Sequence, residues 1–296
     1  MLEAQRQETA DSDAEPLVTA VICTYKRANL VTRAIRSVQN QTYNNIEIIV
    51  VDDASPDNTG KVIAGLADRR VRYIRHEQNK GLPAGRNTGI RAAKGSYIAF
   101  LDDDDEWKAN KIELQLQFLK KLPAEAVLCA HYVNGKQIRR FGRQIVARDD
   151  LKKGNRFGAG SGLMVRASVL RNVWFDESIG QGEDWDALIR IASCYRIGYL
   201  DELLFNVNEA EHERMTTAAR NMPISALEAR MKVFAKHREF FGEYWFRYHS
   251  ARTLLSYFRH REGKGKYLLY ALRRCGPLAV GAVLFDMVRR KLLQVV

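Results

Sequence analysis

SYIAFLDDDDEW, residues 96–107, indicates the fold most directly, because an apolar run of strand length stops there at four consecutive aspartates. Three short, β-branched runs precede it: VTAVIC at 18–23, IEIIVV at 46–51 and VRYI at 71–74. The segments between these runs space their apolar residues as helices do. This alternation predicts an α/β fold in which a mainly parallel sheet is covered by helices.

The flanking segments refine this prediction. Apolar residues between 30 and 38 fall on one helical face behind Asn29, the expected N-cap, and a second amphipathic helix is expected over 112–119. Residues 125–205 instead mix short apolar runs with the glycine-rich stretches GAGSG (158–162) and GQGED (180–184). We expect these stretches to form loops that build pockets.

Composition excludes several classes of protein. The 296 residues are 46% hydrophobic and 28% charged, which excludes collagen-like and largely disordered chains. The four cysteines are too widely separated for a redox or zinc motif, and the polar start lacks the features of a signal peptide. No run approaches the roughly 20 apolar residues of a membrane span. We therefore expect a cytoplasmic protein.

The net charge of +12 is distributed unevenly along the chain. Residues 1–16 are acidic and are expected to form a disordered tail, residues 17–221 the α/β domain, and residues 222–296 a helical, aromatic and basic region. Such a basic region can attract nucleic acid, anionic lipid or an acidic partner, and composition does not choose among them.

Polar residues follow three of the four apolar runs directly: TYKR at 24–27, DDAS at 52–55 and DDDD at 102–105. Ligands of open α/β sheets bind at this edge, beyond the carboxyl ends of the strands. Adjacent carboxylates raise one another's pKa values unless a cation neutralises them. All-oxygen ligands favour a hard ion, so the sequence predicts a Mg²⁺ or Mn²⁺ site, with a solvated acidic turn as the simpler alternative.

Other phosphate-binding folds lack their defining features here. No GxGxxG follows the first run and no GxxxxGK[ST] occurs, which argues against dinucleotide-binding and P-loop folds. A response-regulator receiver carries its acidic pair after the first strand, whereas this first run ends in TYKR.

Five motifs occur in a specific order: TYKR, VVDDASPDNT, NKGLPAGRNTG, FLDDDDEW and GEDWD. In that order they resemble family 2 glycosyltransferases over roughly residues 17–220. The resemblance implies a GT-A fold and an inverting transfer of a sugar from a nucleotide donor, most simply UDP. It also implies a saccharide or lipid-linked glycan as acceptor.

The resemblance also assigns roles to individual residues. Tyr25 would stack on the nucleotide base and Asp53 would accept a hydrogen bond from it. Arg86 would bind the diphosphate through its forked donors. The complete set implied for the donor is Thr24, Tyr25, Arg27, Asp53, Gly81, Arg86, Asp102 and Asp103.

The same likeness implies that Asp104 contacts the metal and that His212 is a third ligand, although a lone histidine is more often a surface residue. Asp184 would be the catalytic base, with Glu183 and Trp185 beside it on the acceptor side. A purely structural reading of GEDWD is also available, since acidic residues are favourable in the first turn of a helix. The two readings are compatible.

The apolar run PLAVGAVLF at 277–285 is flanked by arginines and a lysine. It is too short to span a bilayer, so it predicts either an interfacial helix on the inner face of the cell membrane or a helix packed on the catalytic domain.

Two alternatives to an active transferase are a nucleic-acid-binding protein that uses the basic tail and an inactive nucleotide-sugar-binding module. The strand-end acids argue against the first, so no nucleic acid is expected as a partner, and the intact acidic motifs argue against the second.

Overall fold

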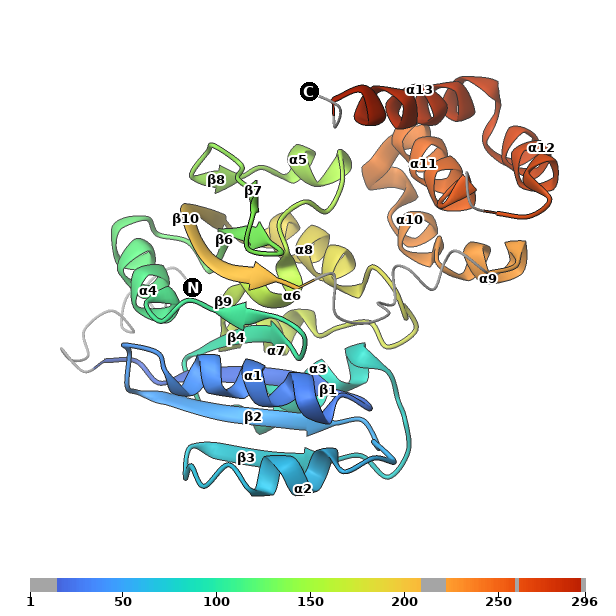
Figure 1. The fold of residues 1–296 in the computed structure, drawn as a ribbon. Coiled ribbons are helices and arrows are strands. Elements are labelled where there is room, and N and C mark those ends of the chain that lie inside the picture. The colour runs from blue at the N-terminus through green and yellow to red at the C-terminus, as the bar shows by residue number, and fades with distance from the viewer. Residues whose placement is uncertain (1–14, 209–221, 259–260, 294–296) are drawn as a thin grey trace.

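The computed structural model describes residues 15–208, 222–258 and 261–293. The expected disordered tail therefore lies outside the described residues, apart from its last two positions. One sheet runs through the α/β part, in the strand order β3-β2-β1-β4-β9-β6-β10-β5 (Figure 1).

Four parallel strands form one half of this sheet: β1 (Val18–Thr24), β2 (Ile46–Asp52), β3 (Val71–Arg75) and β4 (Tyr97–Asp102). Val18 aligns with Ile46 on one side and with Tyr97 on the other. The equal register brings the carboxyl ends of β1, β2 and β4 to one edge. The four predicted runs are confirmed to within one residue at each end.

The other half of the sheet is mixed. The short strand β9 (Met164–Arg166) lies antiparallel between β4 and β6 (Ala126–Val133), and β10 (Ile197–Val207) runs parallel to β6. The edge strands are β5 (Glu106–Trp107), β7 (Gln137–Arg139) and β8 (Ile145–Val146). Residues 125–205 therefore extend the sheet as well as forming loops, and the predicted mainly parallel α/β fold is confirmed.

Helices cover both faces of the sheet. They are α1 (Ala28–Gln39), α2 (Thr59–Ala64), α3 (Leu82–Ala92), α4 (Lys111–Lys121), α5 (Arg148–Lys152), α6 (Ala159–Gly162), α7 (Ala167–Val173) and α8 (Glu183–Cys194). Strand side chains alternate between the faces, so Ile48 and Val50 pack in one core with α1 and α4. Ile49 and Val51 pack in the other, with α3, α7 and α8.

Helix α1 starts earlier than the sequence predicted, and helix α3 packs closely on strand β1. Asn29 is not the N-cap, since α1 begins at Ala28 with Arg27 in the capping position and no side-chain cap. Gly89, in the motif NKGLPAGRNTG, lies close to strand β1. A Cβ added at Gly89 would lie 2.3 Å from Val21 Cγ1, so only glycine lets α3 pack at this distance.

The C-terminal helices are α9 (Ile224–Ala229), α10 (Lys232–Lys236), α11 (Arg238–Leu254), α12 (Lys264–Cys275) and α13 (Pro277–Leu293). They gather beside α5 and α8, with α12 and α13 packed on α11 (Figure 1). Buried Asp186 of α8 binds Lys236 and His237, each over 2.7 Å. None of the helices in the described ranges is long and apolar enough to span a bilayer.

The apolar run 277–285 is divided between two environments. Ala279, Val280 and Val283 are buried in the core that includes α11, whereas Leu278 is 89% exposed and Phe285 69% exposed. Packing of this helix on the rest of the chain is thus observed for one face, and the other face remains available.

Candidate active site

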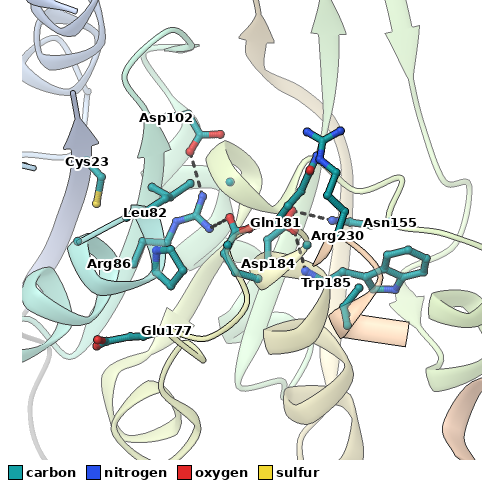
Figure 2. A pocket seen from close by; sticks show the side chains of 18 of the residues that line it. Cys23, Leu82, Arg86, Asp102, Asn155, Glu177, Gln181, Asp184, Trp185 and Arg230 are labelled. Carbon is teal, nitrogen blue, oxygen red and sulfur yellow. Dashed lines mark hydrogen bonds and ion pairs between the residues drawn. The ribbon is translucent and has the colours of Figure 1, made fainter. Parts of the chain in front are cut away.

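A pocket of about 930 Å³ lies between the carboxyl ends of the parallel strands and the C-terminal helices. Tyr25, Asp53 and the aspartates after β4 line one end, and α8 with Asp184 lies deeper along the wall. Figure 2 shows Asp102 and Cys23 on one side of this space and Asn155, Trp185 and Arg230 on the other. The pocket therefore joins most of the predicted site residues in a single space.

Three aspartates at the end of β4 form a compact group of oxygens. Asp102, Asp104 and Asp105 each offer a carboxylate oxygen, and these atoms lie within 4.8 Å of one another. Asp105 is held in place by Ser161 Oγ, which donates to its Oδ2 over 2.6 Å. An all-carboxylate set of this size fits a hard divalent cation, as the sequence predicted. Asp105 is an additional potential ligand.

Asp103 points instead toward β1. Thr24 Oγ1 donates to Asp103 Oδ2 over 2.6 Å, and Arg27 Nη1 donates to Asp103 Oδ1 over 2.7 Å and to Asp104 Oδ2 over 3.1 Å. Burial raises the pKa of Asp103 to about 6, although Arg27 and Thr24 act in the opposite direction. The structure thus brings Thr24, Arg27 and the aspartates together through direct contacts.

Tyr25 and Asp53, which follow β1 and β2, line the same pocket. The Tyr25 ring is 38% exposed, with Lys26 Nζ 5.0 Å from its centroid. Asp53 accepts hydrogen bonds from the backbone N–H groups of Lys80 and Gly81, each over 2.8 Å, and pairs with His76 Nδ1 over 2.7 Å. Asp53 therefore fixes the turn that begins α3. No motif in the sequence predicted the contact with His76.

Arg86 is buried between two carboxylates. Its Nη1 donates to Glu183 Oε1 over 2.7 Å and its Nη2 to Asp102 Oδ1 over 3.0 Å, as Figure 2 shows. Burial disfavours the Arg86 cation, but the charges of Glu183 and Asp102 outweigh this effect and raise its pKa. Burial also raises the pKa of Glu183, against the pull of Arg86. Through Arg86, Glu183 therefore connects α8 to Asp102 at the end of β4.

Asp184 lies in the first turn of α8, after Gly182 with φ +81°. Its Oδ2 accepts a hydrogen bond from Asn155 Nδ2 over 2.6 Å, and its Oδ1 accepts one from the Trp185 N–H over 2.7 Å. The helix N-terminus expected at GEDWD is confirmed. Asp184 also lines the pocket, so it is placed to contact a ligand there.

Trp185 lines the pocket but is only 8% exposed. Its indole N–H donates to the Leu151 carbonyl over 2.9 Å, and its ring packs edge-on against Phe234, Phe241 and His249. Most of this side chain supports the junction with the C-terminal helices. His212, which the sequence analysis named as a third metal ligand, lies outside the described residues.

Several pocket residues carried no recognisable signal in the sequence. They are Asn155, Gln181, Arg230, Arg252 and Ser256, which come from four separate segments. Among these five residues, Gln181 alone lies in a stretch, GQGED, that the sequence analysis expected to form a pocket loop. The arrangement as a whole can bind a divalent cation and an anionic ligand at one end, and it presents the Asp184 carboxylate further along the same wall.

Comparison with solved structures agrees with this architecture. S. aureus TarS 1-349, crystallised with UDP-GlcNAc, is 16% identical and superposes with a TM-score of 0.63, over 92% of either chain. The mannosyltransferase PcManGT of Pyrobaculum calidifontis, in complex with GDP-Man and Mn²⁺, is 20% identical and superposes with a TM-score of 0.59, over 97% of this chain and 86% of that chain.

Likeness at 16–20% identity shows the fold alone. It confirms the GT-A fold that the sequence predicted.

Relatives found by sequence share a higher identity with this chain than these solved structures do. An uncharacterized glycosyltransferase of Rickettsia conorii is 35% identical over 200 residues, which cover 64% of this chain and 32% of that protein. The chain thus spans about a third of the length of this relative. The UDP-Glc:alpha-D-GlcNAc-diphosphoundecaprenol beta-1,3-glucosyltransferase WfgD of Escherichia coli is 40% identical over 105 residues, 36% of this chain and 42% of that one.

The region that matches a known family coincides with the part of the sheet that carries the site. Residues 19–174 match Glycosyl transferase family 2, and this range includes β1, β2, β4 and the aspartates that follow them. Because the match covers more than half of the chain, the protein belongs to glycosyl transferase family 2.

Proposed function

We propose that the protein is an inverting, metal-dependent glycosyltransferase that moves a sugar from a UDP donor to a saccharide or glycolipid hydroxyl in bacterial surface polysaccharide synthesis. The observation that carries the proposal is that one pocket holds both the Asp102–Asp104 carboxylates and Asp184. Residues 17–221 would form the catalytic domain and residues 222–296 a helical region that packs on it.

The donor would lie across the ends of β1, β2 and β4. Tyr25 would stack on the base and Asp53 would accept a hydrogen bond from it. Asp102 and Asp104, with Asp105 beside them, would hold Mn²⁺ or Mg²⁺, which supplies positive charge beside the leaving diphosphate when bound. The UDP-GlcNAc complex of TarS and the UDP-Glc in the name of WfgD support a UDP donor.

Asp184 would take the proton from the attacking hydroxyl. Asn155 and the Trp185 N–H hold its two oxygens in a fixed orientation, which suits a base that must meet its substrate in one geometry. Attack from the side opposite the diphosphate in a single displacement inverts the anomeric carbon. Glu183 would act indirectly, by holding Arg86 beside Asp102.

The acceptor would be lipid-linked, and the protein would bind the inner face of the cell membrane peripherally. Leu278, Phe285 and Val288 recur at helical spacing on α13 and are all exposed, beside the exposed cation of Arg289. An apolar stripe next to basic residues complements anionic lipid. The name of WfgD, which specifies a diphosphoundecaprenol acceptor, supports the same class of substrate.

Co-sedimentation with anionic liposomes tests the membrane contact. Wild-type protein should bind at low salt and less at high salt, because headgroup attraction is screened. Phe285→Glu should reduce binding at low salt, whereas Ile138→Glu, on the distant strand β7, should not. Equal binding by the two variants would contradict a contact through α13.

Metal-dependent donor binding tests the function itself. A panel of nucleotide sugars, each with Mn²⁺, Mg²⁺ or EDTA, should give thermal stabilisation and transfer with a UDP-sugar and metal. Asp104→Ala should remove the metal-dependent part of binding, and Asp149→Ala, an exposed carboxylate away from the pocket, should leave it intact. Donor binding that is the same in EDTA would contradict the proposal.

A further inference from the structure

The pocket continues past Asp184 to the C-terminal helices. Arg230, which follows α9, and Arg252 of α11 both line this end. Arg252 lies next to the loop that carries Asn155, since a Cβ added at Gly154 would be 4.0 Å from Arg252 Nη1. In Figure 2, Arg230 and Asn155 lie on the side of the pocket away from Asp102.

Three polar atoms at this end have no hydrogen-bond partner among the residues that the structure describes. Six buried side-chain nitrogen or oxygen atoms in the described ranges make no hydrogen bond, and three of them belong to residues that line this pocket: Asn155 Oδ1, Gln181 Oε1 and Ser256 Oγ. Buried polar atoms nearly always have a partner in folded proteins. Two of the three are amide oxygens, which accept hydrogen bonds, so a ligand rich in hydroxyl groups would satisfy them.

The charge at this end is opposite to that at the donor end. Carboxylates dominate beside β4, and two guanidinium groups line the far end. Burial lowers the pKa of Arg230. The Arg261 cation lowers this pKa further, whereas Tyr257 raises it. An anion beside Arg230 would therefore be favourable, and a phosphate offers the paired oxygens that a guanidinium binds best.

We propose that this end of the pocket is an acceptor subsite, in which Arg230 and Arg252 bind a phosphate or diphosphate group attached to the acceptor saccharide. Asn155, Gln181 and Ser256 receive hydroxyl groups of the same acceptor. The inference rests on the proposed function and adds the chemical class of the acceptor. It places the acceptor sugar between the anionic group and Asp184, which is where the attacking hydroxyl is needed.

Calorimetric titration with geranyl diphosphate in EDTA tests this subsite. Without metal, the carboxylates beside β4 repel the diphosphate from the donor end. Wild-type protein should bind the probe, and Arg230→Gln and Arg252→Gln should each weaken binding about tenfold or more. Arg252→Lys should retain part of the affinity. Arg238→Gln, which removes an exposed arginine outside the pocket, should change nothing.

A parallel titration with UDP and Mn²⁺ separates this inference from the proposed function. Affinity for UDP should be unchanged in all four variants, and a wild-type protein that fails to bind UDP would contradict the proposed function alone. Equal affinity of the Arg230, Arg252 and Arg238 glutamine variants for geranyl diphosphate would overturn the acceptor subsite. So would a matching loss of UDP affinity, since the arginines would then bind the donor.

Discussion

Asn155 Nδ2 donates a hydrogen bond to Asp184 Oδ2 over 2.6 Å, from a loop that precedes Asp184 by 29 residues. The second oxygen of Asp184 is held by the Trp185 N–H. Together these contacts orient the carboxylate in the pocket. Asn155 is therefore a positioning residue for the proposed base.

Asn155→Ala should lower kcat about tenfold, because the Asp184 carboxylate loses a donor worth about 1.5–3 kcal/mol. Steady-state kinetics measure this loss. Asn172→Ala, on the exposed end of α7, is the control. A kcat equal to that of the wild type would contradict a positioning role for Asn155.

Arg86→Met should lower the free energy of unfolding by about 3–5 kcal/mol, because it leaves the Glu183 and Asp102 carboxylates near each other without their buried cation. The double variant with Glu183→Gln should recover part of this loss. Urea denaturation measures both. An Arg86→Met protein as stable as the wild type would show that the pair is not needed for folding.

Gly89→Ala should cost about 1–3 kcal/mol of stability, because its Cβ would overlap Val21 between α3 and β1. Gly281→Ala is the matched control, since nothing lies within 4 Å of its added Cβ in α13. That change should stabilise the protein by up to about 1 kcal/mol. Similar melting temperatures for the two variants would contradict the packing described for α3.

The contribution of His249 to stability should fall as the pH falls from about 6.5 toward 4. Burial lowers the pKa of His249 to about 4, so the unfolded chain binds this proton before the folded protein does. Each pH unit in this window should cost about 1.4 kcal/mol through this histidine, and its contribution should be constant above pH 6.5. His249→Gln should flatten the slope measured by denaturation, and an unchanged slope would contradict the assignment.

The four parallel strands could be predicted to within a residue because each is a β-branched run that stops at polar residues. Strand β9 could not be predicted, because its three residues are too few to show a periodic pattern. Its place in the sheet is set by its neighbours β4 and β6. The expected cap at Asn29 was wrong because helix α1 begins at Ala28, so that the capping position falls two residues earlier, at Arg27.

The site residues also divide into those that stand in sequence motifs and those that do not. Asp102–Asp104 and Asp184 stand in contiguous motifs, and the structure brings them to one pocket. Asn155 and Arg230 stand in no motif, and packing of distant segments alone brings them to the same space. Sequence thus indicates the proposed donor end of the pocket well and the proposed acceptor end poorly.

The central claim is tested most directly by Asp184→Asn, assayed for donor binding and for turnover in the same preparation. The account predicts unchanged metal-dependent affinity for the UDP donor and a turnover lower by about 10²–10⁴, which is the usual contribution of a general base. Turnover equal to that of the wild type would contradict it.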